Sequence, residues 1–423
     1  MSSTQFATPE IPAAAAAVDT CLRELGLIDG FRGDALRRLV EAFGDLATVA
    51  SQPRRRLAEA LPPALAERVR RGPEADLLQR TQSWLAQPDR HLISLCDPRY
   101  PQGLREQPDP PPLLWLQGDP ALLFHPALAI IGSRRATPQG LADARAFARH
   151  LGSAGLTIVS GLAEGIDGAA HEGALDTLGR TVAFLGHGLD RIYPPVHRAL
   201  AHRIAAQGLL ASEYPLGSPA LRHHFPERNR LISAFSLGTL VIEAGLRSGS
   251  LVTARLAQEQ GRELMALPGS IHAPMAKGCH QLIREGASLV ETAEHVWAQL
   301  EQPLHRFRQA LAAAGLTAND PPLAAGADAP APAAPPLSGV LPEADPAWKE
   351  PTCAVLRALQ SGPAHTDRIA SWIGLTAGQV SSILGREELL GRVIRLADGQ
   401  YQALAPCAAV TGESDGRNSI GES

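Results

Sequence analysis

Arginines and small hydroxyl residues cluster in two turns within residues 225–256. Arg228, Asn229 and Arg230 precede an apolar turn, and a β-branched run then leads to a second polar turn of Ser248, Gly249 and Ser250. Backbone N–H groups at the start of a helix and the guanidinium group of arginine both bind anions. No catalytic dyad, metal-ligand spacing or thiol pattern accompanies them in the sequence. The pattern therefore favours a protein that binds a polyanion over an enzyme, and we expect no catalytic residue and no metal site.

Glycine-containing turns follow three further segments that are predicted strands. Ligands of an open α/β sheet bind beyond the carboxyl ends of its strands. One such turn is an ordinary connection to a helix, but several turns joined by basic residues predict a shared anion site. The predicted nucleic-acid-binding residues are Gly132, Ser133, Arg134, Ser160, Gly161, Gly186, Gly188, Arg222, Phe225, Arg228, Asn229, Arg230, Ser248, Gly249 and Ser250.

These turns do not have the spacing of a nucleotide-binding loop. The first reads Gly-Ser-Arg-Arg-Ala-Thr-Pro rather than G-x-G-x-x-G. The two lysines of the chain, Lys277 and Lys349, do not lie in a phosphate-binding P-loop. We therefore expect neither NAD nor ATP, and no other cofactor.

Three carboxylates and a histidine near the turns could either catalyse acid–base chemistry or hold neighbouring side chains in place. Glu164, Asp167 and Glu243 lie close to strand ends, and His171 follows Asp167 by one helical turn. Such carboxylates either act as general acid and base or hold arginines by ion pairing. Because no nucleophile or metal-ligand pattern lies nearby, we favour supporting roles.

Phe225 has two interpretations that the sequence leaves open. His223 and His224 precede it, and these flat rings offer surfaces on which bases can stack. A phenylalanine in this position can equally anchor the hydrophobic core.

Residues 128–300 alternate between apolar strands and helical segments. Strands that are apolar throughout, separated by helices, are typical of a parallel sheet covered on both faces. We therefore predict an α/β domain of Rossmann-like, doubly wound type. Its predicted strands are 128–131, 156–159, 181–185, 208–211, 239–242 and 263–267.

Two segments precede this domain. Residues 17–86 contain short helical patterns, and the turn 26–33 resembles the loop of a helix-hairpin-helix, which can bind DNA phosphate. The second expected hairpin lacks glycine, so we favour a structural helical module (SAM or helix-hairpin-helix-like). Residues 87–127 are proline-rich, and we expect an extended lead-in that packs on the next domain.

Three segments follow the domain. Residues 301–349 form an Ala/Pro-rich linker that cannot bury a core, 350–405 predict a winged helix, and 406–423 a disordered tail. The third helix of the winged helix places Arg386 beside Glu387 and Glu388. Because reading a duplex needs a basic face, we expect this domain to make protein contacts or to bind duplex weakly.

Bulk composition sets outer limits. The chain has 423 residues, 45% hydrophobic and 19% charged, with a net charge of −4, so any basic surface must be local. Its five cysteines show no C-x-x-C spacing, which favours a reducing cytoplasm. No signal peptide or membrane-spanning run is predicted.

Taken in order, the motifs of the central domain resemble the DNA processing protein A (DprA/Smf) family. The helical module in front and the winged helix behind agree with longer members of that family. The matching segments are AIIGSRRAT (129–137), VSGLAEGIDGAAHEGAL (159–175), FLGHGLDRIYPPVHRAL (184–200), SEYPLGSPALRHHFPERNRLIS (212–233), EAGLRSGSLVTARLAQEQGRELMALPGSI (243–271) and KGCHQLIREGA (277–287).

The resemblance implies a non-enzymatic protein that binds and protects single-stranded DNA and helps to load RecA recombinase in natural transformation. It implies that the arginine of the G-S-R motif, here Arg134, lies in the DNA pocket. The basic position ahead of F-P-x-R-N-R maps to Arg222. The resemblance also implies a homodimer formed through the later part of the Rossmann-like domain, with the RecA contact overlapping that face.

Two rival functions fit parts of the sequence. The run from Gly238 to Glu243 also resembles the lysine-decarboxylase-like nucleoside monophosphate hydrolases, although it lacks the first glycine pair of their motif and its glutamate comes one residue late. A transcriptional regulator that uses the winged helix is the other rival, and the acidic third helix argues against it.

Overall fold

The computed structural model describes residues 13–313 and, towards the C-terminus, residues 355–356, 358–359, 363–373, 375–389, 393–396 and 399–403. The chain divides into two compact units, residues 1–327 and 328–423. Residues 314–349 of the predicted linker and the predicted tail 406–423 lie outside the described residues.

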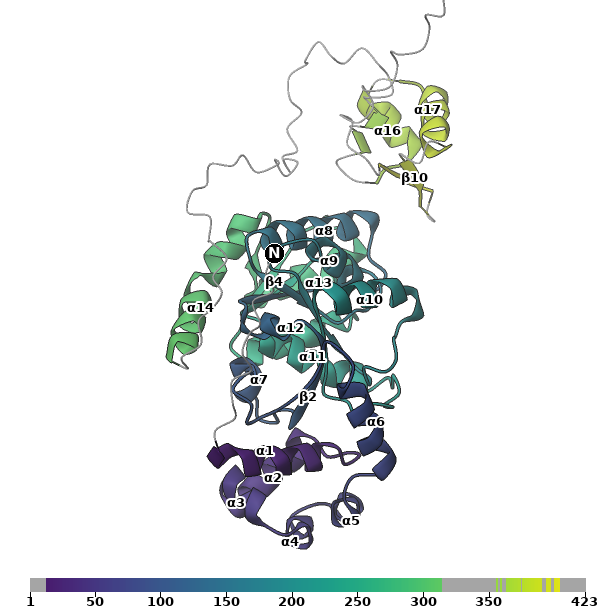
Figure 1. The fold of residues 1–423 in the computed structure, drawn as a ribbon. Helices are drawn as coiled ribbons and strands as arrows, with labels where there is room; N and C mark the ends of the chain where they lie inside the picture. Colours follow the sequence, from purple (N-terminus) through teal and green to yellow (C-terminus); the bar gives the residue numbers. More distant parts are fainter. Residues whose placement is uncertain are drawn as a thin grey trace, which may run out of the picture. The chain divides into compact units, whose positions relative to one another are not determined.

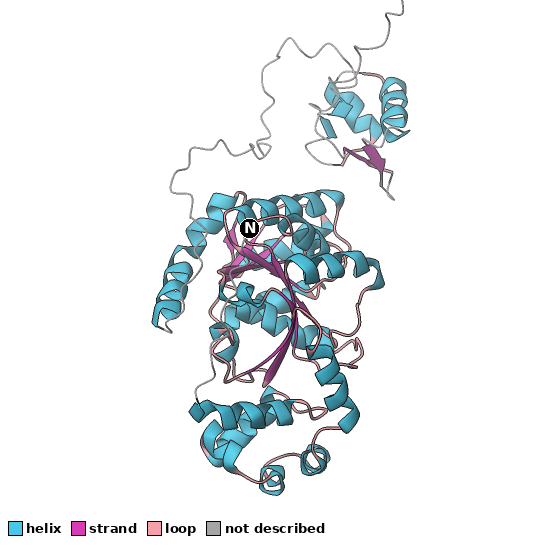
Figure 2. Cartoon of the chain, viewed as in Figure 1, coloured by secondary structure: helices cyan, strands magenta, loops and turns pink. Residues whose placement is uncertain are grey.

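In the first unit the described strands form one nine-stranded sheet with helices on both faces (Figures 1 and 2). The order is β1-β2-β6-β5-β4-β3-β7-β8-β9, and the strands from β6 to β9 are parallel. All six predicted strands are present, and the Rossmann-like α/β class is confirmed. The parallel strands are β3 (Ala127–Ile131), β4 (Thr157–Ser160), β5 (Thr181–Leu185), β6 (Leu209–Ser212), β7 (Gly238–Val241), β8 (Glu263–Ala266) and β9 (Ser288–Leu289).

The segment 87–127 is part of this sheet and not only a lead-in that packs on it. It contributes β1 (Arg90–Ser94) and β2 (Leu113–Gly118), with the short helix α7 (Gln102–Arg105) between them, and β2 pairs antiparallel with β6. Both faces of β2 are buried, because Leu114 and Leu116 face one core cluster and Trp115 faces another. The expectation for this segment is corrected accordingly.

Alternating side chains of the central strand β3 point into different cores. Leu128 and Ile130 belong to one cluster, and Ala129 and Ile131 belong to the other, as the pleat of a strand requires. The first cluster packs under α8 (Pro138–Ser153), α9 (Ile166–Ala174) and α14 (Ala293–Ala313), and the second under α11 (His224–Phe235), α12 (Ser250–Glu259) and α13 (Lys277–Arg284). Helix α10 (Arg198–Gln207) packs near β2 and β6, and short 3-10 helices span Pro120–Phe124, Pro195–His197 and Pro274–Ala276.

The N-terminal helices share a hydrophobic core with the sheet. Leu22, Leu25 and Leu36 lie in the same cluster as Ile93 and Leu114 of β1 and β2. This module packs beside β1 and β2 (Figure 1) and is continuous with the main domain. Its helices are α1 (Ala13–Gly26), α2 (Gly33–Phe43), α3 (Leu46–Ser51), α4 (Arg54–Glu59), α5 (Pro63–Arg71) and α6 (Ala75–Leu85).

The turn between α1 and α2 is partly buried, with Asp29 and Gly30 exposed at its tip. Phe31 is buried, and a Cβ added to Gly33 would lie 2.2 Å from the carbonyl oxygen of Asp109, so that only glycine permits this approach. The backbone at Gly33 is therefore not free to bind a phosphate. The geometry supports the structural interpretation of this module.

Helix α14 continues beyond residue 300, where the linker is predicted to begin. Val296, Leu300 and Leu304 recur at intervals of four and are buried in the core cluster under α8. This apolar stripe, with the partly buried Phe307 after it, holds the helix on the domain, and the helix itself continues to Ala313. The predicted start of the linker at residue 301 is therefore wrong, because α14 extends to Ala313.

The described part of the second unit has the helices and hairpin of a winged helix. Helices α16 (Thr366–Ile373) and α17 (Ala377–Leu389) pack over a small core, and β10 (Val393–Arg395) pairs antiparallel with β11 (Tyr401–Ala403). This agrees with the predicted fold of the segment.

Candidate nucleic-acid interface

The strand order reverses beside β3, which is where an open α/β sheet binds its ligand. Strands β4, β5 and β6 lie on one side of β3, and β7, β8 and β9 lie on the other. The crevice of such a sheet opens beyond the carboxyl ends of β3 and β7, next to the N-terminus of α8. The predicted turns after β3 and β7 are therefore neighbours.

A carboxylate of the protein itself fills this crevice. The side chain of Glu243 accepts hydrogen bonds from the backbone N–H of Thr137 at 2.9 Å and from its hydroxyl at 2.6 Å. The hydroxyl of Thr137 in turn accepts from the N–H of Gly140 at 3.0 Å and caps α8. A Cβ on Gly140 would lie 2.4 Å from the carboxyl carbon of Glu243. The carboxylate thus takes the place at the helix N-terminus where a nucleotide phosphate would bind.

In the turn after β3, Gly132 and Ser133 pack against the protein, and Arg134 is exposed to solvent. Ser133 donates its N–H to the carbonyl oxygen of Glu243 at 2.7 Å, and its hydroxyl accepts from the N–H of Arg135 at 3.0 Å. A Cβ on Gly132 would lie 2.6 Å from the side chain of Ile166. Arg134 is exposed at the apex of this turn. Gly132 and Ser133 therefore shape the turn, and Arg134 is the group that can reach a ligand.

Arg228 lies in the protein interior, contrary to its predicted role on the binding surface. It is 3% exposed and donates hydrogen bonds to the carbonyl oxygens of Gly161, at 2.9 Å, and of Phe184. Burial lowers the pKa of its guanidinium to about 10, and the nearby carboxylate of Asp167 opposes that shift. Because its donors are used on strand ends β4 and β5, Arg228 fixes α11 against the sheet.

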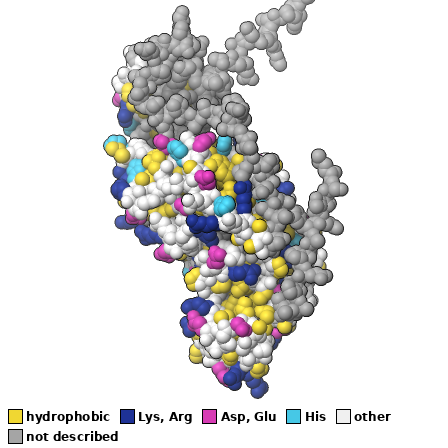
Figure 3. Space-filling model, turned by 90° about the vertical axis from the view of Figure 1, so that its left-hand side faces the viewer, with side chains coloured by type: hydrophobic (Ala, Val, Ile, Leu, Met, Phe, Trp, Pro, Cys, Tyr) yellow, Lys and Arg dark blue, Asp and Glu magenta, His cyan; other side chains and the backbone are white. Residues whose placement is uncertain are grey.

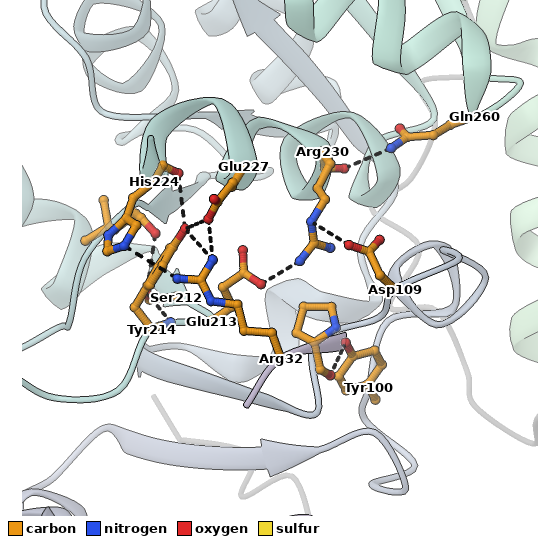
Figure 4. A network of polar contacts seen from close by, with 12 residues as sticks. Arg32, Tyr100, Asp109, Ser212, Glu213, Tyr214, His224, Glu227, Arg230 and Gln260 are labelled. Carbon is orange, nitrogen blue, oxygen red and sulfur yellow. Dashed lines mark hydrogen bonds and ion pairs between the residues drawn. The ribbon is translucent and has the colours of Figure 1, made fainter. Parts of the chain in front are cut away.

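Arg230 points to the other side of α11 and is also paired within the protein. It forms ion pairs with Glu213 at 2.5 Å and with Asp109 at 3.6 Å, and its side chain is 14% exposed (Figure 4). Burial raises the pKa of Glu213, and the charge of Arg230 opposes that shift. Asn229, between the two arginines, accepts a hydrogen bond from Arg228 at 3.2 Å. The internal pairing of Arg228 and Arg230 contradicts the prediction that these two face an anion, whereas the predicted role of Asn229 in binding stays a prediction.

The carboxylate and the histidine of the second turn are also buried and bonded. Asp167 accepts hydrogen bonds from the N–H groups of Gly161 and Ala163, and burial raises its pKa. His171 accepts from the N–H of Leu162 at 3.3 Å and contacts the hydroxyl of Thr181 at 2.6 Å. Burial lowers its pKa to about 3, so the ring is neutral at physiological pH. These contacts give both groups the supporting roles that the sequence favoured, whereas Glu164 is exposed.

An exposed arginine and two aromatic rings meet at the strand ends. The guanidinium carbon of Arg134 lies 5.8 Å from the centre of the Phe225 ring, and the centres of the Tyr193 and Phe225 rings are 5.5 Å apart. Tyr193 is 46% exposed, and Phe225 is half-buried. We call Arg134, Tyr193 and Phe225 the aromatic–arginine surface. Arg222 and His223, both exposed, precede Phe225 in the chain.

The remaining predicted residues take mostly structural positions. Gly186 lies under the rings, since a Cβ there would come within 3.3 Å of Phe225. Gly188 is buried in a turn, and the hydroxyl of Ser160 donates to Ile130 at 2.7 Å. At the start of α12, the hydroxyls of Ser248 and Ser250 bond each other at 2.7 Å beside the exposed Gly249.

Tyr193 is a member of this surface that the sequence did not single out. It stands directly before Pro194 and Pro195, in the connection between β5 and α10. A residue directly before two prolines is disfavoured in a helix and is typical of a loop, and this was the available signal.

The face of the molecule in Figure 3 is not uniformly basic. On the face shown in Figure 3, the Lys and Arg side chains of the coloured residues are interspersed with Asp and Glu. This agrees with the net charge of −4 and with a local binding surface.

The fold and the site define a class of proteins in which a helical module, a Rossmann-like sheet and a winged helix share one chain, and in which the nucleotide crevice of the sheet is closed by protein. The family model for DNA recombination-mediator protein A matches residues 91–301, and the model for the DprA winged helix domain matches 328–399. The chain therefore belongs to the DNA processing protein A (DprA/Smf) family.

Individual proteins that are similar to this chain belong to the same family. Protein Smf of Escherichia coli is 46% identical over 229 residues, which are 54% of this chain and 61% of that protein. Protein Smf of Synechocystis is 39% identical over 324 residues, 72% of this chain and 78% of that protein. The X-ray structure of DNA processing protein A from Streptococcus pneumoniae superimposes with a TM-score of 0.58 at 36% identity, covering 65% of this chain and 95% of that one.

None of the described helices combines the length and the apolar character needed to cross a membrane.

Proposed function

We propose that this chain binds single-stranded DNA at the aromatic–arginine surface, protects it, and helps to load RecA recombinase onto it. In this account the protein acts without catalysis, in the cytoplasm, and as a homodimer. Membership of the DNA processing protein A family supports the DNA-binding and recombination-mediating role. The RecA and homodimer parts rest on that membership alone, and the cytoplasmic part rests on the cysteine pattern of the sequence.

The placement of Arg134 over Phe225, with Tyr193 beside the same ring, is the observation that carries the DNA-binding part. Single-stranded nucleic acid is held by guanidinium groups that follow the backbone and by rings on which bases stack. Stacking is tolerant of sequence because every base has a flat face. In a duplex the bases are stacked on each other, so that exposed rings of this kind favour the single strand.

Glu243 argues against the nucleoside monophosphate hydrolase. A general base must be free to take a proton from the reacting group. Both carboxylate oxygens of Glu243 accept hydrogen bonds from Thr137 and close the crevice that the nucleotide would need. Incubation with nucleoside monophosphates should release no free base, and steady turnover would contradict a non-catalytic role.

A titration tests the proposed binding. A labelled oligothymidine and a duplex of equal length are titrated with the full chain at two salt concentrations. We expect tighter binding of the single strand, weakened by salt because phosphate contacts release counterions. Equal or tighter binding of the duplex would contradict the proposal. Light scattering of the same samples tests the homodimer, and RecA filament formation on coated single strands tests loading.

A further inference from the structure

One side chain of the N-terminal module, that of Arg32, contacts helix α11, which carries Phe225. Arg32 is the N-cap residue of α2 and follows the buried Phe31. Its guanidinium carbon lies 4.6 Å from the centre of the Tyr214 ring, and its Nη1 forms an ion pair with Glu227 in the first turn of α11 (Figure 4). A residue of the module is thus bonded to the helix of the proposed DNA-binding surface.

His224, the neighbour of Phe225, completes this contact. Its ring stacks on Tyr214 with centroids 4.1 Å apart, and Nδ1 lies 3.2 Å from the carbonyl oxygen of Gly186. With Nδ1 donating to that oxygen, Nε2 is free to accept from Nη2 of Arg32, at 3.5 Å. The Tyr214 hydroxyl contributes further bonds to the backbone oxygen of His224, at 3.3 Å, and to the carboxylate of Glu227, at 3.0 Å.

The position of Arg32 is itself fixed by close packing. A Cβ on the next residue, Gly33, would overlap the backbone of Asp109, and a Cβ on Gly26 would lie 2.5 Å from Leu113 at the start of β2. Both glycines let the ends of the turn approach the sheet segment closely. The module therefore cannot shift without moving the guanidinium group that binds α11.

We propose that Arg32 is a positioning residue for DNA binding, through which the N-terminal module holds the first turn of α11 so that the Phe225 ring stays beside Arg134 and Tyr193. This inference rests on the proposed function. In it, Arg32 contacts no DNA. The helical module then contributes to DNA binding indirectly. A partner that displaces the module would lower the affinity for single-stranded DNA.

Two variants of opposite charge test the proposal. Arg32→Gln removes a positive charge and Glu227→Gln removes a negative one, so that simple attraction to phosphate predicts weaker binding for the first and tighter binding for the second. Positioning predicts that both weaken binding of a labelled oligothymidine, by roughly threefold or more, with the salt dependence unchanged. Neither can lose more than Phe225→Ala does, because both act through that ring.

The matched control is Arg54→Gln. Arg54 lies in the same module, makes an ion pair with Glu24 at 2.6 Å, and carries the same charge. Its substitution should leave the affinity for single-stranded DNA within experimental error. An equal loss in Arg54→Gln and Arg32→Gln would assign the effect to charge and overturn the proposal.

A double-mutant cycle gives the decisive readout. In a Phe225→Ala background, Arg32→Gln and Glu227→Gln should cause little further loss, because the ring that they position is absent. Full additivity, or wild-type binding by both folded single variants, would overturn the proposal. If Arg32→Gln fails to fold in a thermal melt, Glu227→Gln alone decides, since tighter or unchanged binding contradicts positioning. If Phe225→Ala itself binds as the wild type, the proposed function at this surface fails instead.

Discussion

Arg228 donates a hydrogen bond to the carbonyl oxygen of Gly161 at 2.9 Å, across the boundary between helix α11 and the end of strand β4. Arg228, although it stands in a basic sequence motif, therefore stabilises the fold. The exposed Arg134 near it is available to a ligand. The two arginines should therefore respond to mutation in different ways.

Arg228→Met should destabilise the protein strongly. It leaves the carboxylate of Asp167 buried without its nearby cation, and two backbone carbonyls without their donor. Each buried acceptor that loses its donor costs about 1–3 kcal/mol. Urea unfolding followed by circular dichroism measures the loss. Arg222→Met, at an exposed position, is the control and should change the unfolding free energy by less than about 0.5 kcal/mol. Equal stability of both variants would contradict the interior role of Arg228.

Arg134→Ala should leave stability unchanged and weaken binding of single-stranded DNA. Each phosphate contact with a single strand contributes about 0.7 to the slope of log Kd against log salt concentration, so the slope should fall by about that amount. Arg180→Ala is the control, because Arg180 lies at the opposite end of β5 in an exposed ion pair with Asp119 at 3.0 Å. A binding curve for Arg134→Ala that overlays the wild type at both salt concentrations would remove Arg134 from the site.

Phe225→Ala should weaken binding by about 1–3 kcal/mol, roughly 5- to 150-fold in Kd, which is the usual contribution of one stacked base. The salt slope should not change, because no charge is lost. Phe225→Tyr retains the ring and serves as the control, with affinity close to that of the wild type. If the alanine and tyrosine variants bind alike, Phe225 is a core anchor and does not stack on a base.

Tyr193→Ala should weaken binding in the same way, and Tyr193→Phe should not. The reason is the place of the ring, 5.5 Å from that of Phe225 and 46% exposed. Fluorescence anisotropy with a labelled oligothymidine distinguishes the two variants. A loss in Tyr193→Phe as large as in Tyr193→Ala would assign the effect to the hydroxyl group and not to stacking.

His171 should make the fold sensitive to acid. Its pKa is lowered from 6.5 to about 3 in the folded protein by burial, so that between these values the unfolded chain binds a proton that the folded one does not. The neutral His171 therefore causes no loss in the free energy of unfolding above pH 6.5. Between pH 6.5 and about 3, that free energy falls by about 1.4 kcal/mol per pH unit as the pH falls.

The variant His171→Gln tests this pH dependence. Its side-chain oxygen can still accept from the N–H of Leu162, but it does not titrate. The unfolding free energy of the variant should fall less steeply than that of the wild type between pH 6 and 4, the window set by the shifted pKa. Parallel curves would show that His171 does not remain neutral in the folded state.

The parallel sheet could be predicted from the sequence because each strand is a short apolar run beside a helix. The strand β2 could not, although LLWLQG is equally apolar, because its partner β6 is about a hundred residues away and local pattern does not reveal pairing. The end of α14 was missed for a different reason. Its apolar residues continue to Leu304, but the composition becomes rich in alanine and proline soon afterwards.

Of the candidate site, the sequence named Arg134 and Phe225, and their role in binding stays a prediction. The turns and Arg134 could be named because several glycine-containing turns joined by basic residues follow the predicted strands. The inward direction of Arg228 was available from spacing, since Leu231 and Ile232 lie three and four residues on, on the same face of the helix, and are buried. The pairing of Arg230 with Glu213 depends on tertiary contact and could not be read locally.

Photo-crosslinking tests the central claim most directly. A single-stranded oligonucleotide carrying halogenated uracil is bound to the full chain, irradiated, and the attached peptides are identified by mass spectrometry. The account predicts crosslinks at Phe225 and Tyr193, reduced in the Arg134→Ala variant. Crosslinks confined to the winged helix, or to the N-terminal module, would contradict it.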